Sequence, residues 1–224
     1  MWRADVITLY PEMFPGSSGH SLAGKAKDKL WSLNTVQLRN FGSGKHRAVD
    51  DTPAGGGPGM VIRADVAAAA LDSIPNDNRP RLIMTPRAKP LQQSQIRTWS
   101  AGEGLVIFCP RFEGIDERII AARGLIPVSI GDYVLSGGET AALVVLEACL
   151  RLIPGVMGKE ASGTDESFEN GLLEYAQFTR PADFEGQPIP DVLQSGNHAE
   201  IARWRQADAL ETTKRLRPDL LEKA

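Results

Sequence analysis

Three short stretches carry the residue types of a ligand-binding loop, and each directly follows an apolar run that predicts a strand. They are PRAKP after Thr85, PRFEG after Cys109 and GDYVLSGGE after Ile130. In an open parallel sheet, ligands bind beyond the carboxyl ends of the strands, where glycine lets the backbone approach a ligand closely. Gly137 and Gly138 also open a predicted helix, whose free N–H groups can donate to an acceptor. An ordinary turn would explain any one stretch, but three at one sheet edge favour a binding site.

Other familiar chemistries have weaker support. The chain has neither the dinucleotide pattern GxGxxG after a strand nor the phosphate loop GxxxxGK[ST]. GGGPGM (Gly55 to Met60) has the composition of a phosphate loop, but it follows a polar stretch, and a flexible loop with backbone donors is an equal alternative. Ser136 is outside a nucleophile elbow, and no motif links it to His20 or His46. Cys109 ends an apolar run, which favours a core thiol over a nucleophile.

Two acids and one arginine are further candidates for functional side chains. Asp165 and Glu166 lie in a polar, acidic stretch, where carboxylates are usually only solvated. Arg151 ends the longest apolar helix pattern, and the helix dipole alone would explain a cation there. The three histidines and two cysteines are scattered along the chain, so we predict no structural metal site.

The hydrophobic periodicity predicts the elements that would position these residues. Helical patterns separate five apolar runs rich in β-branched residues, which indicates a parallel α/β sheet. The strongest helix pattern starts at Gly137-Gly138 and is stopped by Pro154-Gly155. The predicted strands are Ala4–Leu9, Thr35–Leu38, Arg81–Thr85, Leu105–Cys109 and Ile126–Ile130.

Composition and polarity define the expected domains. Hydrophobic residues make up 42% and charged residues 24% of the chain, as in globular proteins, and the net charge of −3 argues against a generally basic nucleic-acid coat. We expect a sheet domain at 1–158, a polar linker at 159–170 and a helical domain at 171–224. No apolar run has the length of a membrane helix, and the N-terminus does not resemble a signal peptide. Two cysteines in apolar patterns favour a reducing cytoplasm. One face of the last helix would present Ile201, Trp204, Ala207 and Leu210.

A longer series of motifs runs through the chain: YPEMF, KHRAVDDTPAGGGPGM, RFEGIDER, SIGDYVLSGGE, RLIPGVMGKEAS, FTRP and SGNHAEIARWR. Together they resemble the bacterial tRNA (guanine-N1)-methyltransferases of the TrmD family, which modify the guanosine just 3′ of the anticodon (tRNA position 37). The resemblance implies a SPOUT-type sheet tied into a deep C-terminal trefoil knot, which chain-topology rules would not predict. It also implies S-adenosylmethionine as methyl donor, tRNA as substrate and magnesium for turnover, although no ligand set for that ion is recognisable. The implied assembly is a homodimer in which the cofactor pocket of one subunit and the RNA-binding domain of its partner make one active site.

The resemblance also implies which residues would hold the cofactor. Pro110 departs from the family pattern, in which glycine is usual, and proline has no backbone N–H to donate. The stretch TPRAKPL departs from the commoner SPQG pattern as well. The implied cofactor residues are Thr85, Pro86, Pro110, Phe112, Glu113, Gly114, Ser129, Ile130, Gly131, Tyr133, Leu135, Gly137 and Gly138.

Catalytic and RNA-binding roles follow from the same resemblance. Arg151 would stabilise negative charge on guanine O6, and the aligned general base is Glu166, with Asp165 one step earlier as the alternative. Three rival hypotheses remain: a knotted methyltransferase for another base or a ribose, an RNA-binding module without catalysis, and a phosphate-binding enzyme that uses GGGPGM. The implied RNA-binding residues are His46, Arg47, Arg180, Asn197, His198, Arg203 and Arg205.

Overall fold

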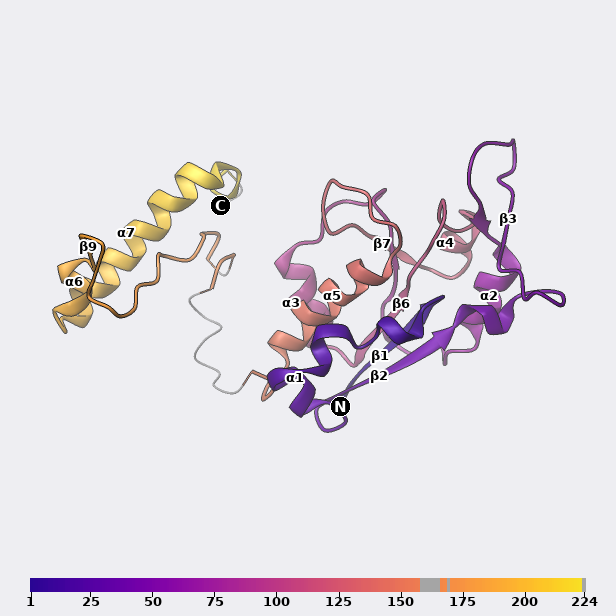
Figure 1. The fold of residues 1–224 in the computed structure, drawn as a ribbon, viewed down its shortest axis with the longest axis horizontal. Coiled ribbons are helices and arrows are strands. Elements are labelled where there is room, and N and C mark those ends of the chain that lie inside the picture. The colour runs from indigo at the N-terminus through magenta and orange to yellow at the C-terminus, as the bar shows by residue number, and fades with distance from the viewer. Residues whose placement is uncertain (158–165, 169, 223–224) are drawn as a thin grey trace. The chain divides into compact units, whose positions relative to one another are not determined.

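The chain divides into two compact units, Met1–Glu160 and Ala161–Ala224, which we call the N-terminal and C-terminal units (Figure 1). The computed structural model describes residues 1–157, 166–168 and 170–222. Most of the predicted linker, residues 159–170, therefore lies outside the described residues, and so does Asp165.

A five-stranded sheet with the order β2-β1-β6-β5-β7 forms the centre of the N-terminal unit. Every neighbouring pair is parallel, which confirms the predicted parallel α/β sheet. All five predicted strands are present. The largest difference is at the second strand, which begins at Trp31, before the predicted start at Thr35. The prediction missed the first half of this strand because that half lacks the β-branched residues on which the prediction relied. The strands are β1 (Trp2–Thr8), β2 (Trp31–Gln37), β5 (Arg81–Met84), β6 (Gly104–Phe108) and β7 (Ile126–Val128).

The two faces of this sheet each contribute to a hydrophobic core. Along β6, Leu105 and Ile107 belong to one core, and Val106 and Phe108 belong to the other. This alternation follows from the two-residue period of a strand, and burial on both faces explains the continuous apolar runs in the sequence. On the outer strand β7, Pro127 occupies an edge, where a missing backbone donor is tolerated.

Helices cover both faces of the sheet (Figure 1). The first core includes residues of α1 (Ser21–Ala26), α3 (Gln93–Ser100) and α5 (Glu139–Leu152), and the second includes residues of α2 (Ala64–Asp72) and α4 (Arg118–Ala122). Helix α1 is shorter than its sequence pattern, because Asp28 has a positive φ of 62° and the chain turns there into β2. A small antiparallel pair, β3 (Asp50–Asp51) and β4 (Val61–Ile62), flanks the GGGPGM loop.

The C-terminal unit consists of a short β-ribbon and helices. Its elements are β8 (Asp183–Phe184), β9 (Gln187–Pro188), α6 (Asp191–Gln194) and α7 (His198–Leu216), followed by a 3₁₀ turn, Pro218–Leu220. The chain before the ribbon runs along α7: the Leu173 N–H donates to Thr213 Oγ1 at 2.8 Å, and the Ala176 N–H donates to Asp208 Oδ2 at 2.8 Å.

The predicted apolar face of α7 is wrong in its second half. Ile201 and Trp204 are half-buried as expected, but Ala207 and Leu210 are exposed, and Ala209 is buried instead. A helix advances about 100° per residue, so each three-residue step falls back by about 60°. After three such steps Leu210 points away from the face that carries Ile201.

A buried arginine network lies beside the amino-terminal end of β5. Arg79 places Nη1 2.6 Å from Asp5 Oδ2 and Nε 3.0 Å from Asp77 Oδ1, and its side chain is 1% exposed. The hydrogen bond from Arg79 holds the pKa of Asp77 below its ordinary value of 3.8. The Asp77 carboxylate therefore stabilises the fold above that pH, and this stabilisation is lost as the pH falls through the lower, folded-state pKa.

We expect Asp77→Asn to lower the free energy of unfolding by about 1–2 kcal/mol at pH 7, because Arg79 loses a charged acceptor. The difference between the variant and the parent should shrink as the pH falls from about 4, where the carboxyl of the unfolded parent becomes protonated, through the lower pKa of the folded parent. Urea unfolding of both proteins at a series of pH values measures it. A difference in the free energy of unfolding that stays constant at the lowest pH measured would contradict a stabilising role of the Asp77 charge.

Candidate functional site

A pocket of about 300 Å³ lies at the carboxyl ends of β5, β6 and β7. These three strands are neighbours in the sheet, in the order β6-β5-β7, and β6 lies between β1 and β5. The segments that leave them therefore meet at one edge, as expected for a ligand site in a parallel sheet. We call these segments the first loop (85–91), the second loop (109–117) and the third loop (129–138).

All thirteen residues that the family resemblance assigns to a cofactor line this one pocket, from Thr85 in the first loop to Gly138 in the third. The assignment missed two charged residues of the second loop, Arg111 and Glu117, although both lie inside the quoted stretch RFEGIDER. The other lining residues that it missed are Ile83, Met84, Arg87, Ile115, Ile120, Val128, Val134 and Ala141. Three of these, Ile83, Met84 and Val128, are apolar residues at strand ends, which strand alternation could have indicated.

Gly138 is the point at which the third loop crosses the strand ends. A Cβ there would lie 2.9 Å from Cys109 Cα, 2.9 Å from Pro110 Cδ and 3.0 Å from Met84 Cβ. The Gly138 N–H donates to the Pro110 carbonyl at 2.8 Å. Only a residue without a side chain can follow this path, so the glycine brings the third loop against the second.

The first and third loops are also joined directly. The Leu91 N–H donates to the Ser129 carbonyl at 2.8 Å. The Ser129 hydroxyl donates to the Gly131 carbonyl at 3.0 Å and accepts from the Gly131 N–H at 3.2 Å. Tyr133 closes the same turn, because its hydroxyl donates to the Ile130 carbonyl at 3.2 Å. These bonds fix the pocket wall that Ser129, Gly131 and Tyr133 share.

Pro110 is buried, and its ring packs against Gly138 while its carbonyl accepts the Gly138 N–H. The residue therefore contributes packing and a carbonyl acceptor to the loop crossing, and it has no N–H to offer a ligand.

The pocket lining carries both signs of charge. Glu113 contributes an exposed carboxylate, and its backbone N–H donates to the Met60 carbonyl at 2.9 Å. The GGGPGM loop thus supports the second loop from outside the lining. Arg87 and Glu117 form an exposed ion pair at 3.1 Å between the first and second loops.

The two cysteines belong to the core, as predicted. Cys109 is fully buried at the end of β6, and burial raises the pKa of its thiol, with a further contribution from the nearby Glu139 carboxylate. Burial also raises the pKa of Cys149 to about 12. Burial thus disfavours the thiolate form of both cysteines, which suits a core role and not that of a nucleophile.

The relatives of this chain decide its family. A family model described as "tRNA (Guanine-1)-methyltransferase TrmD" matches residues 2–223. The chain belongs to the TrmD family. Proteins named tRNA (guanine-N(1)-)-methyltransferase are similar throughout. The protein from Rhizobium johnstonii is 60% identical to this chain, and the match covers 100% of this chain and 92% of the relative. The protein from Bartonella henselae is 63% identical, and the match covers 98% of this chain and 94% of the relative.

TrmD-family membership confirms the resemblance seen in the motifs, and the chain is an enzyme of the methyltransferase class. A methyltransferase needs a methyl donor, and the pocket that contains the thirteen candidate residues is the candidate site for it. A third relative, from Nitrobacter hamburgensis, is 61% identical and covers 98% of this chain and 93% of its own.

Among the described residues of the N-terminal unit, the candidate catalytic residue Arg151 does not line the pocket. Arg151 is an exposed residue in the last turn of α5, ten residues after the pocket residue Ala141, or about 15 Å along the helix axis. Glu166 is half-buried and belongs to the C-terminal unit, and Asp165 lies outside the described residues. The N-terminal unit alone therefore does not bring Arg151 to the pocket.

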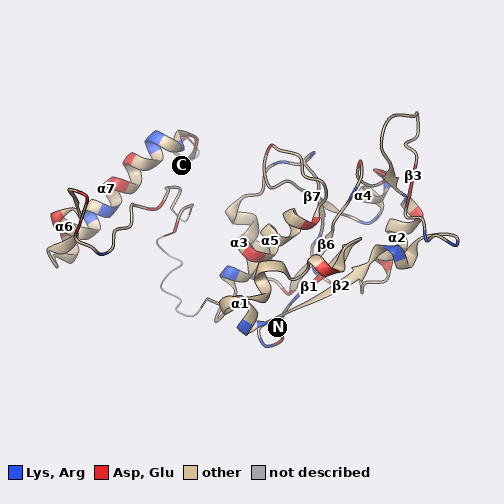
Figure 2. Cartoon of the chain, in the orientation of Figure 1, with Lys and Arg blue, Asp and Glu red and all other residues tan. Residues whose placement is uncertain are grey.

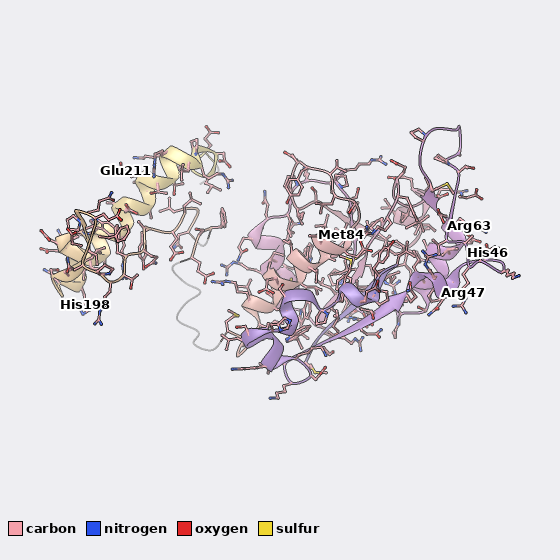
Figure 3. All side chains as sticks on the ribbon, viewed as in Figure 1. His46, Arg47, Arg63, Met84, His198 and Glu211 are labelled. Carbon is pink, nitrogen blue, oxygen red and sulfur yellow. The ribbon has the colours of Figure 1, made fainter. Side chains whose placement is uncertain are left out.

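The candidate RNA-binding residues occupy both units. His46 and Arg47 lie on an exposed turn closed by paired backbone hydrogen bonds between Ser43 and Ala48 (Figure 3). Lys45 adds a second Lys or Arg side chain to this turn, beside Arg47. Figure 2 shows the segment as a blue loop beside α2.

In the C-terminal unit, the candidates Arg180, His198 and Arg203 are exposed. Figure 3 shows His198 at the start of α7, with Glu211 further along that helix. Two candidates have structural roles: the Asn197 side chain caps α7 by accepting the Glu200 N–H at 3.3 Å, and Arg205 lies 4.7 Å above the Tyr175 ring.

The described part of the chain contains no group of three or more His, Cys, Asp or Glu side chains placed to hold a metal ion. None of its helices combines the length and apolarity needed to cross a bilayer.

Proposed function

We propose that this TrmD-family chain transfers a methyl group from S-adenosylmethionine to N1 of the guanosine at tRNA position 37. One observation carries the proposal: the thirteen residues assigned to the cofactor come from three separate loops and line a single pocket. The names of the relatives support the same reaction on guanine N1 in tRNA.

The pocket has the chemistry that this donor requires. Its volume of about 300 Å³ is at the lower end of small-molecule sites and suits a folded conformation of the ligand. Apolar lining residues such as Ile130 and Leu135 fit an adenine ring, while backbone groups around Gly131 and Gly138 permit close approach. The carboxylate of Glu113 and the guanidinium of Arg111 would attract the ammonium and the carboxylate of the amino-acid portion. S-adenosylmethionine would supply an electrophilic methyl group on its sulfonium.

The target nitrogen needs help from the protein. Guanine N1 carries a proton, and it becomes nucleophilic only when that proton leaves. A carboxylate within hydrogen-bonding distance, Glu166 or its neighbour Asp165, would accept the proton. Negative charge then develops on O6, where the guanidinium of Arg151 would stabilise it. A guanosine in the anticodon loop must also leave its stack to reach these groups.

We further propose that the active site is shared between two subunits. Arg151 ends a helix that starts at the pocket, so within one chain it is carried away from the donor. Thr140, Val144, Glu147 and Arg151 lie at helical spacing on the exposed face of α5, and Val144 is 45% exposed. A second copy packed on this face would cover Val144 and could bring its own Arg151 to the first copy's pocket.

We expect Arg151→Ala to reduce kcat by about 100-fold, the scale of one lost oxyanion donor. Mixing this variant with a pocket-deficient Gly138→Val chain, under conditions that exchange subunits, should restore about a quarter of wild-type activity, because half the dimers carry one intact shared site. Methyl-transfer rates of the separate and mixed variants measure this. If mixing restores no activity, pocket and arginine belong to one chain.

The knot is also part of the proposal. Strand β6 lies between β1 and β5, and the third loop bonds to both the first and the second loops. These connections support a threaded carboxyl-terminal segment of the SPOUT type, in which the cofactor loops are the crossing segments.

The RNA-binding residues would be His46 and Arg47 on the basic turn of the N-terminal unit and, separately, the candidates of the C-terminal unit. Their cations would bind the backbone of the anticodon stem-loop, which gives the net acidic chain local basic surfaces.

Labelled S-adenosylmethionine and two tRNA transcripts test the proposed function. The transcripts differ only at the nucleotide 3′ of the anticodon, which is guanosine in one and adenosine in the other. Label should enter the guanosine transcript alone, and parallel reactions with and without magnesium test the ion requirement that the resemblance implies. Equal labelling of both transcripts would overturn the target, and donor binding without labelling would favour an RNA-binding module.

A further inference from the structure

Glu139, the first residue of α5, is a buried carboxylate that does not line the pocket and has no role in the proposed chemistry. It is fully buried, and its Oε1 accepts a hydrogen bond from Thr8 Oγ1 at 2.8 Å. Thr8 Oγ1 in turn accepts from the Tyr10 N–H at 2.9 Å. Glu139 therefore connects the start of α5 to the end of β1, behind the pocket.

Arg111, in the second loop, neutralises this carboxylate from the pocket side. Its Nε lies 2.8 Å from Glu139 Oε2, and its guanidinium lies 4.5 Å from the centre of the Tyr10 ring. The Nε and Oε2 atoms are at ion-pair distance but do not meet the angle of a hydrogen bond, so the attraction is mainly electrostatic. Arg111 Nη1 also donates to the Ser136 carbonyl in the third loop at 3.2 Å.

This pair joins four segments: the end of β1, the second loop, the third loop and α5. Arg111 pairs with Gly137 as an antiparallel bridge, and a Cβ on Gly137 would overlap the Arg111 side chain. A glycine at this position is thus required for the guanidinium to reach Glu139. The pair spans the same two loops that Gly138 and Pro110 bring together.

A buried ion pair is a weak source of net stability, because the desolvation of both charges offsets their attraction. Each charge nevertheless needs the other, since either one left alone in the core is unfavourable. Such a pair is better suited to holding two loops at a fixed spacing than to stabilising the whole fold.

We infer that Glu139 is a positioning residue, which acts through Arg111 to hold the second and third loops at the spacing that the pocket needs for its ligand. It does so without touching that ligand. This role rests on the proposed function, since it takes the pocket to be the binding site of S-adenosylmethionine.

The test compares two buried carboxylates in the same fold. Glu139→Gln keeps an acceptor for Thr8 but removes the charge that faces Arg111. The matched control is Asp5→Asn, because Asp5 is also a buried carboxylate paired with an arginine, Arg79 at 2.6 Å. Asp5 and Arg79 do not line the pocket. Calorimetric titration with S-adenosylmethionine gives Kd, thermal unfolding gives Tm, and steady-state kinetics separates KM from kcat.

Glu139→Gln should raise Kd and KM for S-adenosylmethionine by about tenfold, the scale of one lost charged partner, with kcat at saturating donor changed by less than about threefold. Asp5→Asn should lower Tm and leave Kd unchanged. Hydrogen exchange should quicken at residues 131–138 in Glu139→Gln, and it should stay unchanged there in Asp5→Asn.

Two results would overturn this role, and they are distinguishable. If the wild-type chain does not bind S-adenosylmethionine, the proposed function and the positioning role fail together. If the wild type binds and Glu139→Gln binds equally well despite a lower Tm, only the positioning role fails. If Glu139→Gln does not fold, Thr8→Val replaces it: this variant keeps both charges and should raise Kd by about threefold, and an unchanged Kd would contradict the role.

Discussion

Loss of the carboxylates at positions 165 and 166 is expected to abolish methyl transfer while S-adenosylmethionine binding stays unchanged. General-base catalysis contributes about 10²–10⁴-fold, so the double variant Asp165→Asn/Glu166→Gln should be slower by about that factor. The described residues that line the donor pocket all belong to the N-terminal unit, whereas Glu166 belongs to the C-terminal unit. Single-turnover rates with saturating tRNA and calorimetric titration with the donor measure the two effects separately.

The two single variants decide which acid accepts the proton. If Glu166 is the base, as the alignment with the family motif suggests, Glu166→Gln alone reproduces the loss and Asp165→Asn turns over normally. Glu185→Gln is the matched control, since Glu185 is an exposed acid of the same unit in the turn between β8 and β9. Normal turnover by the double variant would show that neither carboxylate is the base.

Substitution of Gly138, unlike loss of the two carboxylates, should weaken the binding of S-adenosylmethionine. In Gly138→Ala the added Cβ meets the backbone at Cys109, the Pro110 ring and Met84 Cβ, all within 3.0 Å. The φ of Gly138 is −78°, which alanine accepts, so the penalty is one of space alone. Overpacking of this kind costs about 1–3 kcal/mol, and if the third loop moves to relieve it, Kd should rise by about ten- to hundredfold.

Gly102→Ala is the control for this substitution. Gly102 precedes β6, away from the pocket, and a Cβ there would meet only carbonyl oxygens at 3.5 Å and 3.8 Å. Titration of both variants with S-adenosylmethionine gives the comparison. Equal affinity in Gly138→Ala and the wild type would mean that the ligand does not depend on the crossing of the third loop over the second.

The sequence predicts the sheet and the position of the pocket for a clear physical reason. Parallel strands buried on both faces are continuous apolar runs, and the residues after them must lie at one edge. Thr85, Cys109 and Ile130 each end such a run, so their loops could be brought together without a structure. The thirteen pocket residues themselves came from the family resemblance.

The parts that the sequence did not predict depend on contacts between distant segments. Thr8, Arg111 and Glu139 form one buried network, yet nothing local to any of them indicates the others. The exposed position of Leu210 on α7 arises because a constant three-residue spacing drifts around a helix. The strand order, with β6 between β1 and β5, likewise depends on the path of the whole chain.

The identity of the methylated nucleoside tests the central claim most directly. A tRNA carrying guanosine 3′ of the anticodon is incubated with the chain and S-adenosylmethionine, digested, and analysed by chromatography and mass spectrometry. The proposed function predicts N1-methylguanosine, located in the fragment that contains that nucleotide. A methyl group on a ribose 2′-oxygen, or on another base, would contradict it and favour a different RNA methyltransferase built on the same pocket.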